Sequence, residues 1–187
     1  FLSFKDSFYQ FTVKYSVSRS VITLPDDQDG EDAKYRLLKD IIGRLDITNC
    51  TPKDIDEFNC HYRKINIRKN QKTGTTGTSI ISLLSKFATL VDPLRFSMLD
   101  RNAKWSLSEF GYLSRGNILY HEFNKAFETY FIDFRKGLDE DICKYYNELL
   151  GKFIKSEMNK EVFQRRVADK YLWHYYDFRH SKKKQTD

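Results

Sequence analysis

Two ionisable residues flank a proline-containing break in the middle of the chain. Lys86 precedes the break at Asp92 and Pro93, and Asp100 stands at the start of the next periodic segment. A lysine amine can act as a nucleophile, and a carboxylate can stabilise positive charge that develops on a substrate. Asp is also a preferred N-cap residue of helices. Lys86 and Asp100 are therefore the candidate catalytic residues, and a helix cap with a salt bridge at a corner is the structural alternative.

A basic cluster lies upstream of this pair. Residues 61–72, HYRKINIRKNQK, contain five Lys and Arg residues and no acidic residue, whereas the formal net charge of the whole chain is only +6. Clustered cations indicate nucleic-acid binding more strongly than a diffuse excess does. The same residues would also suit the C-terminal end of a helix that begins at Thr51 and Pro52, or a solvated helix face.

A glycine- and threonine-rich stretch follows the basic cluster. Residues 71–79, QKTGTTGTS, predict a turn between helices, and their two glycines would let backbone N–H groups approach a phosphate. A plain flexible loop is the alternative. The candidate nucleic-acid-binding residues are Arg68, Lys69, Lys72, Gly74, Thr75, Gly77 and Thr78.

Other kinds of functional site find no support in the sequence. The four histidines are not spaced i, i+4 and no HExxH motif occurs, while the three cysteines are an odd number without a CxxC pair. No Gly-Lys-Ser or Gly-Lys-Thr follows the glycines, which excludes a nucleotide-binding P-loop. We therefore expect no metal and no cofactor.

The elements that must position these residues are predicted to be helices. Only 8 Gly and 3 Pro interrupt 187 residues, and 16% of the chain is aromatic, so long regular elements should pack through rings. We predict an all-α fold in which one domain, residues 1–187, contains about seven to eight helices. Apolar residues recur at helical spacing in segments 4–15, 35–45, 55–62, 80–90, 103–110, 120–134, 142–153 and 163–171.

Three parts of this domain are expected. The middle, residues 33–137, would contain the turn, the proline break and the candidate residues, and residues 138–180 would form a C-terminal helical pair. Residues 181–187 would be a basic tail. No apolar run approaches the roughly 18 residues that cross a bilayer, so we expect a cytoplasmic protein without a membrane partner.

The order of elements in the middle carries a family resemblance. From Thr75 to Leu107, 33 of the 187 residues, a turn, a helix, a proline break, an apolar bridge and an Asp-started helix follow one another. This order resembles the helix-hairpin-helix DNA glycosylase superfamily, and it is closest to an uncharacterised offshoot with a Ser-Lys, Pro, Phe and Asp pattern. The matching residues are Ser85, Lys86, Pro93, Phe96 and Asp100.

The resemblance implies a central helix-hairpin-helix-like unit whose hairpin binds a DNA phosphate. It also implies that Asp100 is the catalytic carboxylate. In bifunctional members of the superfamily a lysine nucleophile follows the hairpin, whereas this chain has Ser79, Ile80 and Ile81 at that place. Lysine-dependent lyase chemistry is therefore not expected.

Three functions remain open on the sequence. The leading hypothesis is a non-catalytic helical protein that associates with nucleic acid, with DNA as its partner. The first alternative is a DNA glycosylase-like enzyme that uses Asp100. The second is a helical protein without a nucleic-acid role that forms a homodimer through its aromatic C-terminal helix, where residues 171–178 read YLWHYYDF.

Overall fold

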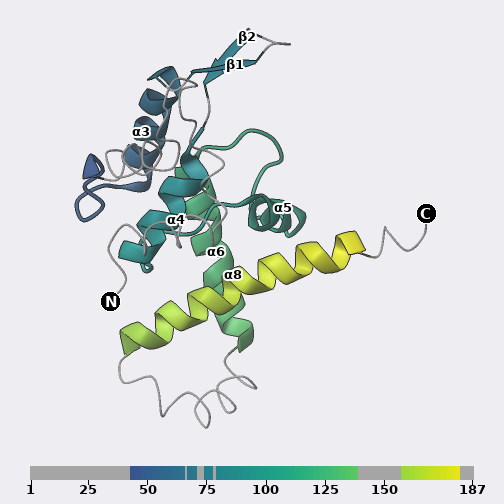
Figure 1. Ribbon diagram of the computed structural model, residues 1–187. Helices are drawn as coiled ribbons and strands as arrows, with labels where there is room; N and C mark the ends of the chain where they lie inside the picture. The colour runs from purple at the N-terminus through teal and green to yellow at the C-terminus, as the bar shows by residue number, and fades with distance from the viewer. Residues whose placement is uncertain (1–42, 66, 71–73, 78, 139–156, 182–187) are drawn as a thin grey trace, which may run out of the picture. The chain divides into compact units, whose positions relative to one another are not determined.

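The computed structural model describes residues 43–65, 67–70, 74–77, 79–138 and 157–181 (Figure 1). The chain divides into two compact units, residues 1–91 and residues 92–187. The boundary lies inside the 33–137 segment, between Lys86 and Asp100. The described residues contain five helices and one two-stranded ribbon. The helical class of the fold is as predicted. The helices predicted over 4–15 and 142–153, and residues 35–42 of the helix predicted over 35–45, lie outside the described residues.

The first unit contains α3, Pro52–Ile65, whose start follows the predicted cap. The backbone N–H of Thr51 donates to Asp54 Oδ2 at 2.6 Å, and the Thr51 hydroxyl donates to the same oxygen at 2.7 Å. These hydrogen bonds lower the pKa of Asp54, because they stabilise the charged carboxylate. Of the predicted buried face, Ile55 and Tyr62 are buried and Phe58 is partly exposed.

Helix α4, Ile81–Val91, packs on α3 in the same unit. The side chains at its start and along one face are completely buried, as the apolar spacing predicts. These residues are Ile80, Leu83, Leu84 and Ala88.

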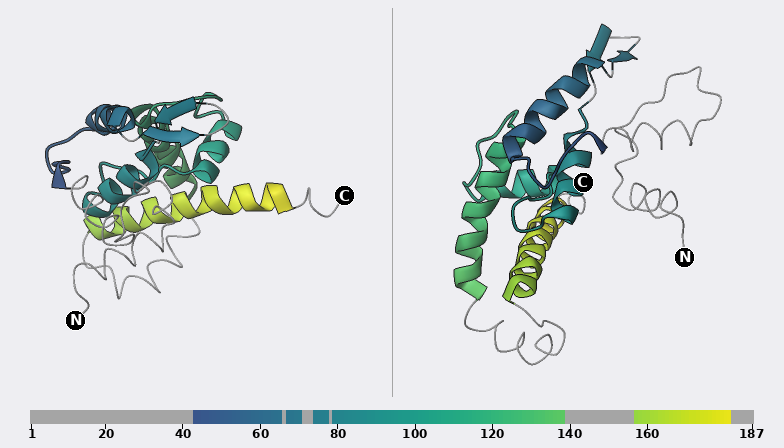
Figure 2. Two further views of the ribbon diagram at one scale, coloured as in Figure 1. Left: turned by 45° about the horizontal axis from the view of Figure 1, so that its top comes forward. Right: turned by 90° about the vertical axis from the view of Figure 1, so that its left-hand side faces the viewer.

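Between α3 and α4 the chain forms an antiparallel ribbon that the sequence did not predict. Strand β1, Ile67–Asn70, pairs with β2, Gly74–Gly77, and the ribbon projects from the C-terminal end of α3 (Figures 1 and 2). The turn predicted over Gly74 to Ser79 is therefore corrected to a strand at 74–77. Thr75 and Thr76 are β-branched and suit extended backbone, and pairing with β1 supplies hydrogen-bond partners to alternate residues of β2.

The second unit contains α5, Arg101–Glu109, α6, Tyr120–Leu138, and α8, Glu157–Ser181. Helices α5 and α6 begin where the apolar spacing predicts. The core of this unit is built from completely buried side chains of all three helices and of the bridge before α5. They include Phe96, Ala103, Leu107, Tyr120, Phe123, Ala168 and Leu172.

A polar anchor holds the bridge before α5 to α6. The N–H of Ser97 donates to Asn124 Oδ1 at 2.8 Å, and the Tyr120 hydroxyl donates to the carbonyl oxygen of Ser97 at 2.9 Å. The Asn124 amide donates to the carbonyl oxygen of Arg95 at 3.1 Å. These buried backbone groups belong to no helix, so side chains of α6 supply the partners that burial requires.

Candidate functional site

The β1–β2 ribbon is tied to the first unit through one asparagine of α3. Asn59 Oδ1 accepts hydrogen bonds from the Ser79 hydroxyl at 3.0 Å and from the N–H of Ile80 at 2.9 Å. The Ser79 hydroxyl oxygen accepts in turn from the N–H of Ile81 at 3.3 Å. The chain that leaves β2 is therefore fixed between α3 and the start of α4, and this anchor positions the base of the ribbon.

The structure places five of the seven predicted nucleic-acid-binding residues on this ribbon. Arg68 and Lys69 belong to β1, opposite Thr76 and Thr75 in the antiparallel register. Gly74, Thr75 and Gly77 belong to β2. Lys72 and Thr78 lie outside the described residues.

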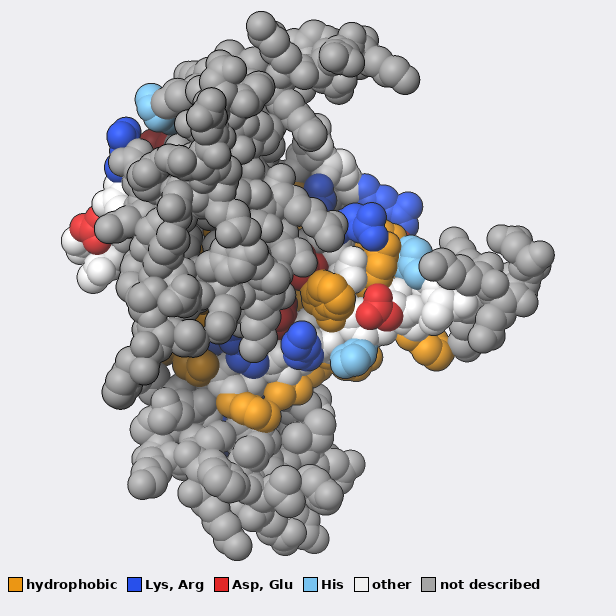
Figure 3. Space-filling view, in the orientation of Figure 1, with side chains coloured by type: hydrophobic (Ala, Val, Ile, Leu, Met, Phe, Trp, Pro, Cys, Tyr) orange, Lys and Arg blue, Asp and Glu red, His pale blue; other side chains and the backbone are white. Residues whose placement is uncertain are grey.

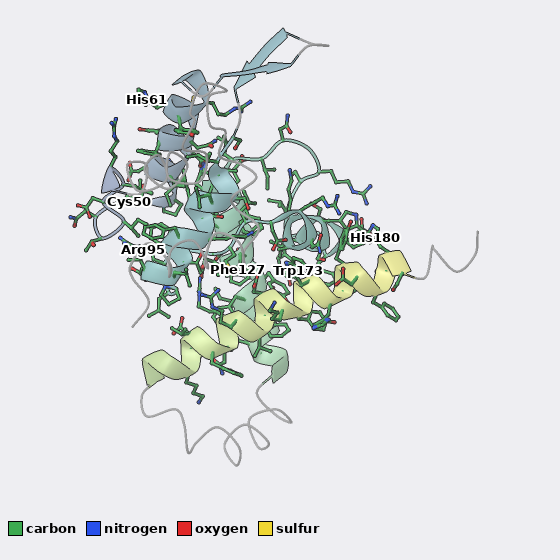
Figure 4. All side chains as sticks on the ribbon, viewed as in Figure 1. Cys50, His61, Arg95, Phe127, Trp173 and His180 are labelled. Atoms are coloured by element: carbon green, nitrogen blue, oxygen red, sulfur yellow. The ribbon has the colours of Figure 1, made fainter. Side chains whose placement is uncertain are left out.

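The end of α3 adds exposed residues to the base of the ribbon. His61 and Arg63 are both exposed in the last turns of this helix (Figure 4). Cations there also interact favourably with the negative end of the helix dipole. The acid-free segment thus passes from a helix end directly into a two-stranded ribbon.

The two predicted catalytic residues belong to different units. Lys86 lies in α4 of the first unit and is partly exposed, whereas Asp100 precedes α5 in the second unit. Each has to be judged from its own surroundings.

Asp100 is the N-cap of α5. Its backbone is extended, with φ −138° and ψ 172°, and its Oδ1 accepts a hydrogen bond from the N–H of Ala103 at 2.8 Å. Its other carboxylate oxygen, Oδ2, accepts a hydrogen bond from the indole N–H of Trp173 on α8. The carboxylate thus joins the start of α5 to α8. The sequence predicted the helix cap but not the bond to α8.

The stabilities of two Asp100 variants test its role as the cap of α5. We expect Asp100→Ala to lower the free energy of unfolding by about 1 to 2 kcal/mol, because the cap and the indole both lose their acceptor. Asp100→Asn should lower it by less than about 1 kcal/mol, since Asn caps helices equally well. Urea denaturation monitored by circular dichroism measures both values. Equal losses in the two variants would contradict the cap assignment.

The second unit contains a buried arginine, Arg165, in an ion pair with Glu128. The Arg165 guanidinium donates through Nη1 to Glu128 Oε2 at 2.7 Å and through Nη2 to Glu128 Oε1. It lies 5.5 Å and 5.1 Å from the ring centroids of Phe127 and Phe131. The guanidinium makes a bidentate pair with one carboxylate inside an aromatic surround, which is the arrangement of a structural ion pair.

The aromatic segment of α8, residues 171–178, contains both packed and exposed rings. Tyr175 packs on Trp105 and Phe110, with ring centroids 6.1 Å and 4.5 Å apart. Tyr171 is 50% exposed, yet its ring also stacks on Phe110, with centroids 6.4 Å apart. Phe178, by contrast, is 55% exposed. Two tyrosines of α8 therefore contact the end of α5, whereas Phe178 is largely open to solvent.

A second group of rings lies where α5 meets the end of α8. His180 stacks on Tyr176, with centroids 3.9 Å apart, and Trp105 meets both rings edge to face. The guanidinium carbon of Arg101 lies 5.7 Å from the Tyr176 ring centroid. Sequence spacing did not reveal this group, because Trp105 and His180 are distant in the chain.

Neither a metal site nor a membrane-spanning helix is found among the residues that the structure describes. In that part of the chain no group of three or more His, Cys, Asp or Glu side chains could hold a metal ion. Nor does any described helix have the length and apolar character needed to traverse a membrane. The basic ribbon, the capped Asp100 and the rings at the end of α8 are the candidates that the geometry offers.

Comparison with known proteins adds no relative to this description. No protein-family model matches the chain, and no match is found among curated proteins or solved structures. The function of the chain has to be argued from its own residues.

Proposed function

We propose that this protein binds duplex DNA through the β1–β2 ribbon and the adjoining end of α3. The observation that carries the proposal is the position of the acid-free segment 61–70, which forms the last turns of a helix and the first strand of a projecting ribbon. A two-stranded ribbon has the dimensions that the major groove admits. Arg68 and Lys69 supply the positive charge that phosphates attract.

The anchor at Asn59 supports the proposal physically. A free hairpin of two four-residue strands is marginally stable in water, and a mobile cation loses more entropy on binding than a fixed one. The hydrogen bonds from Ser79 and Ile80 to Asn59 fix the end of β2 against α3. In the helix-hairpin-helix resemblance a hairpin between helices contacts phosphate, and in this proposal the β-ribbon between α3 and α4 has that task.

The enzyme alternative places the chemistry on Asp100. A glycosylase-like carboxylate would have to face a nucleotide, whereas both oxygens of Asp100 already accept hydrogen bonds from α5 and α8. This geometry favours the structural role. The proposed function is accordingly binding without catalysis.

Charge reversal on the ribbon tests the proposal. The double variant Arg68→Glu/Lys69→Glu should weaken binding of a fluorescent 20-base-pair duplex by about tenfold or more, because two cations near phosphates become anions. The slope of log affinity against log salt should fall by about two, one for each cation removed. Fluorescence anisotropy at several salt concentrations measures both quantities.

The matched control is Lys125→Glu/Arg135→Glu, which reverses two exposed cations of α6 in the second unit. It changes the net charge by the same amount and should alter the affinity little. Equal losses in the two double variants would show that diffuse charge, not the ribbon, attracts DNA. Absence of binding by the unmodified protein at low salt would reject the proposal altogether.

A further inference from the structure

The second unit has a surface on which cations lie beside aromatic rings. It is formed by the first two turns of α5 and the last turns of α8, and we name it the α5–α8 patch. Figure 3 shows Lys and Arg side chains gathered beside a histidine and a hydrophobic group at the C-terminal end of α8, where Figure 4 labels His180. The patch consists of Arg101, Lys104, Trp105, Tyr176, Arg179 and His180.

The rings of the patch are held together but are not buried. Trp105, Tyr176 and His180 are each partly exposed. The Trp105 centroid lies 5.3 Å from that of Tyr176 and 4.7 Å from that of His180, edge to face in both cases. His180 Nδ1 lies 2.9 Å from the carbonyl oxygen of Tyr176, which fixes its orientation. A preformed group of rings loses little entropy when another flat ring packs against it.

The charges around these rings are mainly positive. Arg101 and Arg179 are exposed, and the Lys104 ammonium donates to a neutral acceptor, the carbonyl oxygen of Gly116. Two acids lie nearby: Asp100 accepts hydrogen bonds from the α5 cap and from the Trp173 indole, and Asp177 is exposed three residues before His180 on the same helix face. The three cations of the patch outnumber these two acids.

From this arrangement we propose that the α5–α8 patch binds single-stranded nucleic acid. An unpaired base packs against the rings of Trp105 and His180, and the phosphates beside it contact Arg101 and Arg179. Stacking platforms flanked by cations are the common chemistry of single-strand binding, since every base has a π-face and every nucleotide has a phosphate. An apolar protein partner is disfavoured, because it would bury these cations without neutralising them.

This inference shares the ligand class of the proposed function but rests on other residues in the other unit. The test uses the two tryptophans of the chain, Trp105 and Trp173. In the full-length Trp173→Phe variant, Trp105 is the remaining indole. Titration with a ten-residue oligothymidylate at low salt should quench its emission, because a stacked base lies against the indole.

Two further variants give the expected size of the effect. Arg101→Glu/Arg179→Glu should weaken oligothymidylate binding by about tenfold or more. Trp105→Ala should weaken it by about 10- to 100-fold, measured by anisotropy of a labelled oligonucleotide. The surface charge variant keeps the test decisive if Trp105→Ala fails to fold. The Lys125→Glu/Arg135→Glu variant is again the matched control and should bind normally.

Specific outcomes would overturn the inference. Binding of the oligonucleotide without quenching of Trp105 would place the single strand elsewhere, and absence of binding at low salt would reject the site. A dimer in light scattering that dissociates in Arg101→Glu/Arg179→Glu, without any quenching, would assign the patch to a second copy of the chain. The ribbon variant Arg68→Glu/Lys69→Glu separates the two proposals, since it should lose duplex binding and keep the quenching of Trp105.

Discussion

Replacing Glu128 by alanine is expected to lower the free energy of unfolding by about 3 kcal/mol, because it leaves the buried Arg165 without its partner. The Arg165 side chain is 5% exposed, and both of its terminal nitrogens donate to the Glu128 carboxylate. A buried guanidinium cannot lose its proton, so the charge would have to remain unpaired or draw water into the core. Because Glu128 is itself 36% exposed, the loss should lie at the low end of the range for broken buried pairs.

The matched control removes both charges together. In Glu128→Leu/Arg165→Met the buried charge disappears, and the methionine can still pack against the rings of Phe127 and Phe131. This double variant should be more stable than Glu128→Ala, because paired charges replaced by apolar groups of similar size are often close to neutral. Urea denaturation of the two variants and the unmodified protein gives the comparison. A loss below about 0.5 kcal/mol in Glu128→Ala would show that solvent already screens Arg165.

Helix boundaries in this protein could be predicted from the sequence because their causes are local. Thr51 and Asp54 cap α3 across three residues, and Asp100 caps α5 in the same way. The ring spacing of α6 also identified its buried face, with Phe123, Phe127 and Tyr130 all buried. Each of these features depends on neighbours within one or two turns.

The ribbon could not be predicted in the same way. Whether Gly74 to Gly77 forms a turn or a strand depends on pairing with Ile67 to Asn70, and no local signal in QKTGTTGTS specifies that register. Glycine-rich strands have weak pairing preferences of their own. Asn59 is a weak sequence signal for the anchor at the base of the ribbon, because an asparagine is unfavourable inside a helix unless its side chain has a partner.

Contacts between residues that are distant in the chain could not be predicted from the sequence either. Trp173 meets Asp100 across 73 positions, and Arg165 meets Glu128 across 37. The candidate site was therefore predicted as single residues, and the structure supplies their partners. Those partners changed the interpretation of Asp100, which caps a helix and also holds the Trp173 indole.

Helix α8 shows why an apolar pattern can mislead. The spacing predicted Phe163, Val167 and Tyr171 as its apolar face, yet these side chains are partly or largely exposed. The buried face contains two polar residues and two aliphatic ones, Gln164, Arg165, Ala168 and Leu172. Polar groups become compatible with burial when partners exist, as Glu128 does for Arg165, and such partners cannot be read from the helix alone.

The orientation of α8 can be tested by truncating one residue on each side. Leu172 is completely buried, and its carbonyl oxygen accepts a hydrogen bond from the Ser106 hydroxyl of α5 at 2.7 Å. We expect Leu172→Ala to lower the free energy of unfolding by about 2 to 5 kcal/mol, because it opens a cavity between α8 and α5. Phe178→Ala, at a position that is 55% exposed, should cost less than about 1 kcal/mol although it removes a larger side chain.

The contrast between these two variants decides which side of α8 is the packed one. Urea denaturation measures the free energies, and light scattering at two protein concentrations shows whether the chain associates. A large loss in Phe178→Ala together with a small loss in Leu172→Ala would mean that the aromatic side is buried in solution, as a dimer through α8 requires. The predicted order, with Leu172 the costlier, follows from a helix that buries Leu172 against its own unit and leaves Phe178 largely exposed to solvent.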